Sequence, residues 1–208
     1  MIFVRFAFLM GLLVGFFSAS TWASSLHDST VYIVSVEGAG NGVIVASDEK
    51  RSYILTAAHI ASMTMPQIQY RGELLQEQPK IVTIDNELDI AILAIDREGL
   101  RAVKLGEPQR GQHINIVSFL RCCGATSVSG QLLFPWQDGT WLVATYFMSV
   151  GMSGSGVFAD DKLVCMVHQM GIQNEPQRTS HFGWCVPSTL IAEMMGRAKI
   201  SMARGATP

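Results

Sequence analysis

Residues 151–158 read GMSGSGVF, a serine in a glycine-rich turn that leads directly into an apolar run. Glycine has no Cβ and adopts positive φ readily, so a turn of this kind can direct several backbone N–H groups into one small space. Two other segments place polar residues beside apolar runs. YILTAAH ends at His59, and NELDIAIL places Asp89 immediately before a strongly apolar strand-like run.

These three residues have complementary chemistry. A serine hydroxyl is a weak nucleophile and needs a neighbouring base, which an imidazole supplies when a carboxylate fixes its tautomer and stabilises the imidazolium. The sequence therefore predicts that Ser153 attacks, His59 carries the proton and Asp89 orients the histidine. The backbone N–H groups of Gly151 and Ser153 are the expected oxyanion donors. Each segment alone also fits an ordinary core histidine, a strand-end aspartate or a simple turn.

Most of the chain consists of short β-branched runs separated by Gly, Asn, Asp and Pro. This pattern favours an all-β sandwich or barrel over βαβ units. We expect an N-terminal half at about 28–98, a connection at 98–112, a C-terminal half at about 112–187 and a terminal helix at 188–203. The predicted strands are Thr30–Val36, Gly42–Ala46, Ser52–Thr56, Ile81–Ile84, Ile90–Ile95, Ile114–Phe119, Ser129–Phe134, Trp141–Ala144, Leu163–His168 and Phe182–Val186.

In this order, TAAH, DIAIL and GxSGSG resemble the trypsin-like serine peptidases of the chymotrypsin fold. The compact spacing is most similar to the bacterial glutamyl endopeptidases and the HtrA peptidase domain, and the resemblance runs from Val31 to the terminal helix. It implies two antiparallel six-stranded β-barrels with a C-terminal helix, His59 and Asp89 on the first barrel and Ser153 on the second. At the place that Met152 takes in this sequence, trypsin has an Asp that pairs with a freed N-terminus. A methionine cannot form that ion pair.

The run VCMVHQMG at 164–171 resembles the strand that lines the S1 pocket in this family. His168 in this strand resembles the histidine at the same place in glutamyl endopeptidases and viral 3C-type proteases, which cleave after Glu or Gln. The resemblance implies Glu or Gln at P1, because an imidazole can donate a hydrogen bond to a carbonyl or carboxylate oxygen. Those enzymes add a Thr or Ser hydroxyl where this chain has Met148, so an apolar wall is expected instead. The backbone from Gln169 to Gly171 is expected to pair with substrate as an added strand. A core histidine is the alternative for His168.

The N-terminus has the pattern of an export signal. Arg5 precedes an apolar run at 6–17, and Thr21 and Ala23 supply small residues at a cleavage site. The run is shorter than the roughly 20 apolar residues that a membrane-spanning helix needs. We expect residues 1–23 to be a signal peptide and 24–208 an exported peptidase domain, in the periplasm or secreted. An uncleaved signal anchor is the alternative.

Charge and composition exclude several classes of partner. A formal charge of -2 over 208 residues, without runs of like charge, gives no reason to expect nucleic acid or, after signal cleavage, a membrane. No Cys/His spacing suggests a metal site, and no cofactor is expected. We expect a monomer that acts on protein or peptide. The alternatives are an inactive double-barrel protein that only holds peptides, and an esterase with the same triad.

Four cysteines follow the signal, at Cys122, Cys123, Cys165 and Cys185. An oxidising compartment permits disulfides, although spacing alone leaves the pairing open. The last two fall in apolar runs expected to be neighbouring strands, so they are either a disulfide or two buried thiols. The vicinal pair at Cys122 and Cys123 gives no basis for a choice.

Overall fold

The computed structural model describes residues 26–201 except 122–123, 137 and 176–177, and the side chains of 172–180 are also outside the description. The N-terminal half is one antiparallel sheet of seven strands in the order β5-β4-β1-β2-β3-β7-β6. Its elements are β1 (Thr30–Val34), β2 (Ala39–Ser47), β3 (Ser52–Thr56), α2 (Ala58–Ala61), β4 (Gln67–Tyr70), β5 (Glu73–Leu74), β6 (Lys80–Asp85) and β7 (Ile90–Ile95).

The C-terminal half contains a closed barrel. Six antiparallel strands run in the order β12-β9-β10-β11-β14-β13, and a β12–β13 pairing closes the ring, while β8 adds a short parallel edge to β13. The elements are β8 (Lys104–Leu105), β9 (His113–Leu120), β10 (Gly124–Pro135), β11 (Trp141–Thr145), β12 (Gly156–Ala159), β13 (Lys162–Glu175), β14 (Arg178–Pro187) and α3 (Ser188–Arg197). The prediction of an all-β chain with a six-stranded C-terminal barrel and a terminal helix is confirmed.

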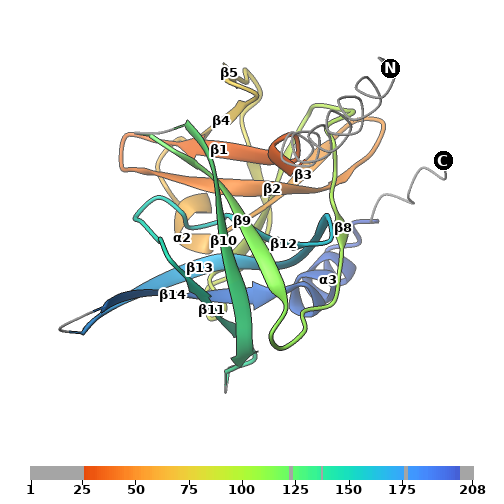
Figure 1. Ribbon diagram of the computed structural model, residues 1–208. Coiled ribbons are helices and arrows are strands. Elements are labelled where there is room, and N and C mark those ends of the chain that lie inside the picture. Colours follow the sequence, from red (N-terminus) through yellow and green to blue (C-terminus); the bar gives the residue numbers. More distant parts are fainter. Residues whose placement is uncertain (1–25, 122–123, 137, 176–177, 202–208) are drawn as a thin grey trace, which may run out of the picture.

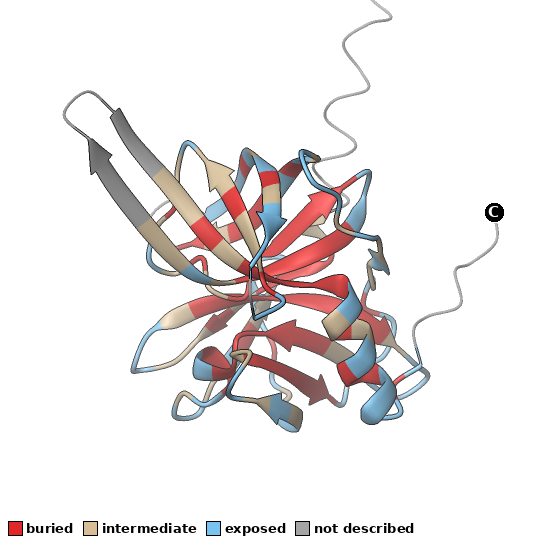
Figure 2. Cartoon of the chain, turned by 90° about the horizontal axis from the view of Figure 1, so that it is seen from below, coloured by how far each residue is buried: buried red, intermediate tan, exposed pale blue. Residues whose placement is uncertain are grey.

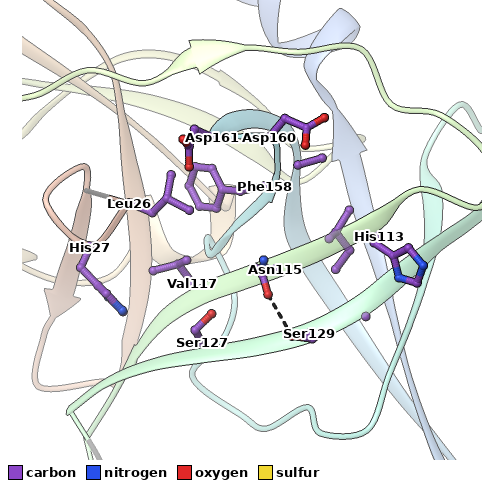
Figure 3. Close-up of a pocket in the computed structure, with 13 residues that line it drawn as sticks. Leu26, His27, His113, Asn115, Val117, Ser127, Ser129, Phe158, Asp160 and Asp161 are labelled. Carbon is purple, nitrogen blue, oxygen red and sulfur yellow. Dashed lines mark hydrogen bonds between the residues drawn. The ribbon is translucent and has the colours of Figure 1, made fainter. Parts of the chain in front are cut away.

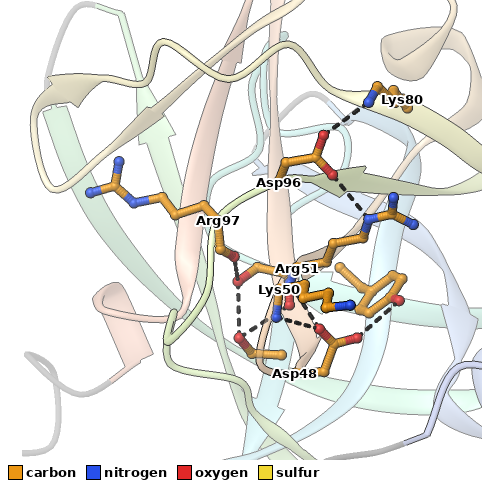
Figure 4. Close-up of polar contacts among 9 residues, drawn as sticks. Asp48, Lys50, Arg51, Lys80, Asp96 and Arg97 are labelled. Atoms are coloured by element: carbon orange, nitrogen blue, oxygen red, sulfur yellow. Dashed lines mark hydrogen bonds and ion pairs between the residues drawn. The ribbon is translucent and has the colours of Figure 1, made fainter.

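The prediction of a closed six-stranded barrel in the N-terminal half was wrong, because in residues 26–121 the outer strands β5 and β6 do not pair. β5 has only two residues, both exposed, and most of β6 is also exposed. Short, charged edges of this kind discourage further strand pairing. Figure 4 shows Asp96 between Lys80 and Arg51, at 2.9 Å from each, on this surface. These ion pairs are solvent-exposed and contribute little to closing the sheet.

One apolar cluster spans both halves, and the C-terminal barrel has a second cluster of its own. A cluster that begins in the first sheet, with Ile33 and Leu55, continues through Phe158 of β12 to Ile191 and Met194 of α3. Strand β9 contacts both β1 and β2, so the halves meet along these strands (Figure 1). Figure 2 shows the buried residues concentrated along the strands of both sheets. Since the core crosses from one sheet to the other, residues placed at the junction are held from both sides.

Three further expectations can be compared with the structure. The terminal helix α3 ends at Arg197 rather than at residue 203, with Lys199 at φ 56 beyond it. Cys165 and Cys185 lie on neighbouring strands as expected and are buried thiols in the structure, the second of the two alternatives. The signal segment and the Cys122–Cys123 pair lie outside the described residues. Within the described chain, no helix has the length and apolarity needed to cross a membrane.

Candidate active site

Strand pairing brings His59 and Asp89 together. Strands β3 and β7 are neighbours, with Thr56 opposite Ala91, so the residues just after β3 lie beside the residue just before β7. His59 Nδ1 lies 2.7 Å from Asp89 Oδ2, and the backbone N–H of His59 donates to Asp89 Oδ1 at 3.0 Å. The carboxylate therefore holds the histidine at two points, and a proton on Nδ1 leaves Nε2 free to act as a base.

The environment of Asp89 favours its ionised form. Burial opposes ionisation, but the hydrogen bonds from the His59 side chain and backbone, together with the charges of His59 and His168, outweigh it and hold the pKa of Asp89 below its ordinary value. The residue also has a positive φ of 51°, a backbone conformation that aspartate and asparagine tolerate better than most residues. Asp89 is thus present as a carboxylate at neutral pH.

Ser153 lies in the glycine turn between strand β11 and strand β12. Gly151 and Gly154 have φ of 95° and 81°, values that L side chains rarely adopt. A Cβ at Gly154 would lie 1.9 Å from the carbonyl oxygen of Asn41, so only glycine fits there. The turn is fixed from the barrel, because Gly154 N–H donates to the carbonyl of Val167 at 2.7 Å.

The turn leaves two backbone donors free. Met152 N–H donates to Ser149, and Ser155 N–H donates to Met152. By contrast, the N–H groups of Gly151 and Ser153 have no acceptor among the residues that the structure describes. These are the two donors that the sequence singled out for an oxyanion. A pair of free N–H groups beside a serine is what a tetrahedral intermediate requires.

His59 and Ser153 line the same cavity, of about 260 Å³. Its other lining residues come from the serine turn and from β13. Within the described residues no hydrogen bond joins Ser153 Oγ to His59, as is common before substrate binds, when such contacts are often long. The structure thus brings Ser153, His59 and the free N–H groups of Gly151 and Ser153 to one cavity.

Residues 40–165 match the trypsin-like peptidase domain, which is more than half of the chain. The chain belongs to the trypsin-like peptidase family. No curated protein matches this peptidase-family sequence significantly.

Solved structures of serine proteases share the fold. The Rv3671c protease from M. tuberculosis H37Rv, in a mutant, inactive form, has a TM-score of 0.67 and 14% identity, with 90% of this chain and 93% of that chain covered. The serine endoprotease from Yersinia pestis has a TM-score of 0.69 and 19% identity, covering 86% and 65%. The HtrA-type protease AlgW, solved with a decapeptide, has a TM-score of 0.69 and 18% identity, covering 86% and 67%. At these identities the likeness concerns the fold alone.

Of the residues expected around S1 in this trypsin-like chain, some line the cavity, whereas Met148 and Gly171 are not among its lining residues. His168, Gln169 and Met170 line the cavity beside Ser153. Met148 is 2% exposed and lies in the core of the C-terminal barrel, with its side chain against Gly183. Gly171 continues β13 after the bulge at Val167/Gln169, where its neighbour on β14 is Phe182.

His168 also approaches the acidic member of the site. Its Nδ1 lies 3.9 Å from Asp89 Oδ2, and its side chain is 13% exposed. Its Nε2 is buried and has no hydrogen-bond partner among the described residues. Burial lowers the pKa of His168 below its ordinary value of 6.5, against the opposing effect of Asp89 and Asp138. His168 is therefore neutral at neutral pH, so it adds no cation beside the carboxylate of Asp89, which interacts mainly with His59.

We expect the protein to lose stability as the pH falls below 6.5. Burial lowers the pKa of both His168 and His27 in the folded state, so the unfolded chain binds protons that the folded chain does not. Stability then rises with pH across this window and falls on acidification. Thermal unfolding between about pH 7 and about pH 5 will show the decline, and His168→Gln will reduce its slope. A slope identical to that of the unsubstituted protein would contradict the assignment to His168.

One residue at the site was not singled out from the sequence. Asn41, within GNG at 40–42, is fully buried and contacts both sides of the serine turn. Its backbone N–H donates to the carbonyl of Ser153 at 2.8 Å, and its side chain donates to the carbonyl of Gly151 at 2.7 Å. The available signal was a polar residue between two glycines, directly before the apolar run that begins at Val43.

A larger cavity, of about 490 Å³, lies away from this chemistry (Figure 3). None of His59, Asp89 and Ser153 lines it, and its walls come from β9, β10, the β12–β13 turn and the segment at Leu26. Among the described residues no three His, Cys, Asp or Glu side chains are placed to hold a metal ion. The smaller cavity is therefore the candidate active site, since it contains Ser153, the Asp89-bound His59 and the free N–H groups of Gly151 and Ser153.

Proposed function

We propose that this trypsin-like chain is a serine endopeptidase that cleaves peptide bonds through an acyl-enzyme on Ser153. The observation that supports it best is the joint presence, at one cavity, of the His59–Asp89 pair, Ser153 and two free backbone N–H groups. The decapeptide in the AlgW structure is consistent with a peptide as substrate. No cofactor takes part in the proposed reaction.

The proposed reaction uses these groups in two stages. Ser153 Oγ attacks the substrate carbonyl carbon while His59 Nε2 accepts its proton. The oxyanion that forms accepts hydrogen bonds from the N–H groups of Gly151 and Ser153, and Asp89 stabilises the imidazolium. His59 then gives the proton to the leaving amine, which breaks the peptide bond and leaves the acyl group on Ser153. Water, activated by the same histidine, releases the acid and restores the enzyme.

Covalent labelling tests this function directly. A fluorophosphonate reacts with an activated serine, so we expect one adduct per chain, located on Ser153 by peptide mass spectrometry, together with hydrolysis of a denatured protein substrate. Failure to label at pH 7–8, with the protein folded, would overturn the proposal and favour a protein that only holds peptides. Labelling together with cleavage of small esters but of no peptide would favour an esterase.

For specificity, we propose Glu or Gln at P1. His168 lines the cavity, and its buried Nε2 has no hydrogen-bond partner among the described residues. A carbonyl or carboxylate oxygen of the P1 side chain can be that partner. A P1 residue that cannot form this hydrogen bond leaves a buried polar group of the site unpaired, and such residues are rejected strongly. A peptide-library profile should show Glu or Gln at P1, and His168→Ala should weaken that preference. Cleavage mainly after Arg, Lys or small aliphatic residues would refute it.

We also propose that substrate pairs with β13 at Gln169 to Gly171 as an added antiparallel strand, and that the enzyme acts after export as a monomer. The basis for export is the signal pattern at residues 1–23. N-terminal sequencing of protein recovered from outside the cytoplasm tests it. An intact Met1 would count against cleavage of the signal, and recovery only from inside the cell would count against export.

A further inference from the structure

We propose that Asn41 is the residue that holds the oxyanion loop, residues 149–155, in its working conformation. This inference rests on the proposed serine-peptidase function. Asn41 contacts neither the substrate cavity nor the reacting atoms, so its role is positioning. It acts through the carbonyl groups of Gly151 and Ser153, whose N–H groups are the proposed oxyanion donors.

Both polar atoms of the Asn41 side chain form hydrogen bonds. Its Oδ1 accepts from the backbone N–H of Phe119 at 2.6 Å, and its Nδ2 lies 2.7 Å from the Gly151 carbonyl oxygen. Nδ2 also lies 3.1 Å from Ser118 Oγ and 3.3 Å from the Phe119 carbonyl. A backbone N–H only donates and a backbone carbonyl only accepts, so these neighbours fix which end of the amide faces which. The loop therefore receives a hydrogen bond that only the amide nitrogen supplies.

The backbone of Asn41 adds a second attachment. Its N–H donates to the Ser153 carbonyl at 2.8 Å, and its own carbonyl accepts from Thr56 Oγ1 at 2.6 Å. Thr56 ends β3, the strand that leads into His59. One residue of β2 thus connects the histidine side of the site with the carbonyls of Gly151 and Ser153. Nucleophile, donors and base are set at fixed positions relative to one another.

The loop needs such an attachment because its own bonds are few. Gly151 has a positive φ, and glycine loses more conformational freedom on ordering than any other residue. Met152, where trypsin has an Asp paired with a freed N-terminus, is buried and carries no charge. The Asn41 amide holds the carbonyl directly before Met152, which fixes the plane of the Gly151–Met152 peptide. Fixing that plane restricts rotation of the adjoining N–H groups of Gly151 and Ser153.

Substitution of Asn41 tests the proposal. In Asn41→Ser the short hydroxyl cannot reach both Phe119 and Gly151. In Asn41→Asp the shape is kept, but an oxygen replaces the nitrogen that faces the Gly151 carbonyl. We expect kcat to fall about 100-fold in each, with KM changed less than about three-fold. Affinity for a peptide boronic acid, which forms a tetrahedral adduct, should fall by a similar factor as kcat.

Ser118→Ala is the matched control. Ser118 is equally buried and belongs to the same hydrogen-bond cluster, but it does not touch the loop. We expect its kcat and boronate affinity to stay within about three-fold of the unsubstituted protein. Each variant is measured below its own unfolding midpoint, and the aspartate variant serves if the serine variant does not fold.

The outcomes separate the two proposals. If the unsubstituted protein is not labelled by a fluorophosphonate, the serine-peptidase function itself fails. If it is labelled and the Asn41 variants have unchanged kcat and boronate affinity, only the role of Asn41 fails. If Ser118→Ala lowers kcat and boronate affinity as much as the Asn41 variants do, the effect is a general loss of packing and the positioning role is overturned.

Discussion

Replacing Ser153 by alanine will lower peptide hydrolysis by about 10⁶-fold and abolish fluorophosphonate labelling. The loss is this large because serine, histidine and aspartate act as a unit, so removing the nucleophile removes the benefit of the others. The substitution deletes one oxygen and leaves the turn intact, since its bonds run through the backbone: the Ser153 carbonyl accepts from Asn41, and Gly154 N–H donates to Val167. The measurement is kcat for a protein or peptide substrate, with folding checked by thermal unfolding.

The same turn supplies a control for Ser153→Ala. Ser155 is fully buried, and its Oγ has no hydrogen-bond partner among the described residues. Its backbone bonds to Met152 and Val167 do not depend on the side chain. Ser155→Ala is therefore expected to keep kcat within about three-fold. Substantial hydrolysis by Ser153→Ala, or its loss in Ser155→Ala alone, would show that the nucleophile has been misassigned.

Local sequence patterns predicted the segments that border the site. The run Ile90–Ile95 was predicted as a strand from its apolar, β-branched residues, and it is buried along its whole length. The glycines around Ser153 identified the turn because their conformations exclude other residues. β4, by contrast, was not predicted, because among its residues only Ile68 is buried and the local signal is weak.

Features that depend on contacts distant in sequence were not predictable in this way. Whether the N-terminal sheet closes depends on how β5 and β6 meet, and neither strand has a pattern that specifies a partner. Asn41 reaches Phe119 and Gly151 across 78 and 110 residues, and nothing in GNG indicates those partners. The proximity of His168 to Asp89 is also a product of how the two sheets meet, since the two residues belong to different halves of the chain.

Asp89→Asn will lower kcat by about 10⁴-fold with little change in KM. An amide has one acceptor oxygen and one donor nitrogen, whereas the carboxylate accepts from both the backbone N–H and Nδ1 of His59. If the oxygen keeps the backbone bond, the amide nitrogen faces Nδ1 and can only donate to it. The imidazole then carries its proton on Nε2, where it cannot accept the proton of Ser153, and the imidazolium loses its counter-charge.

The asparagine substitution is a clean probe at this position. Residue 89 has φ 51°, and asparagine tolerates this conformation nearly as well as aspartate, whereas alanine would add backbone strain. Asp85→Asn in the same turn is the matched control. Asp85 accepts from the backbone N–H groups of Glu87 and Leu88 through one oxygen, which an amide retains. Its kcat should stay within about two-fold of the unsubstituted protein.

A second measurement on Asp89→Asn distinguishes loss of charge from loss of structure. Asp89 raises the pKa of His168, in opposition to burial, so removing its charge will lower that pKa further. The His168 resonance should therefore titrate at lower pH in Asp89→Asn than in the unsubstituted protein, while the thermal midpoint near neutral pH changes little. If kcat stays within ten-fold while the His168 titration moves as expected, the carboxylate is correctly placed but is not part of the catalytic machinery. If neither changes, the contact between Asp89 and the two histidines is itself wrong, and the triad must be sought elsewhere in the chain.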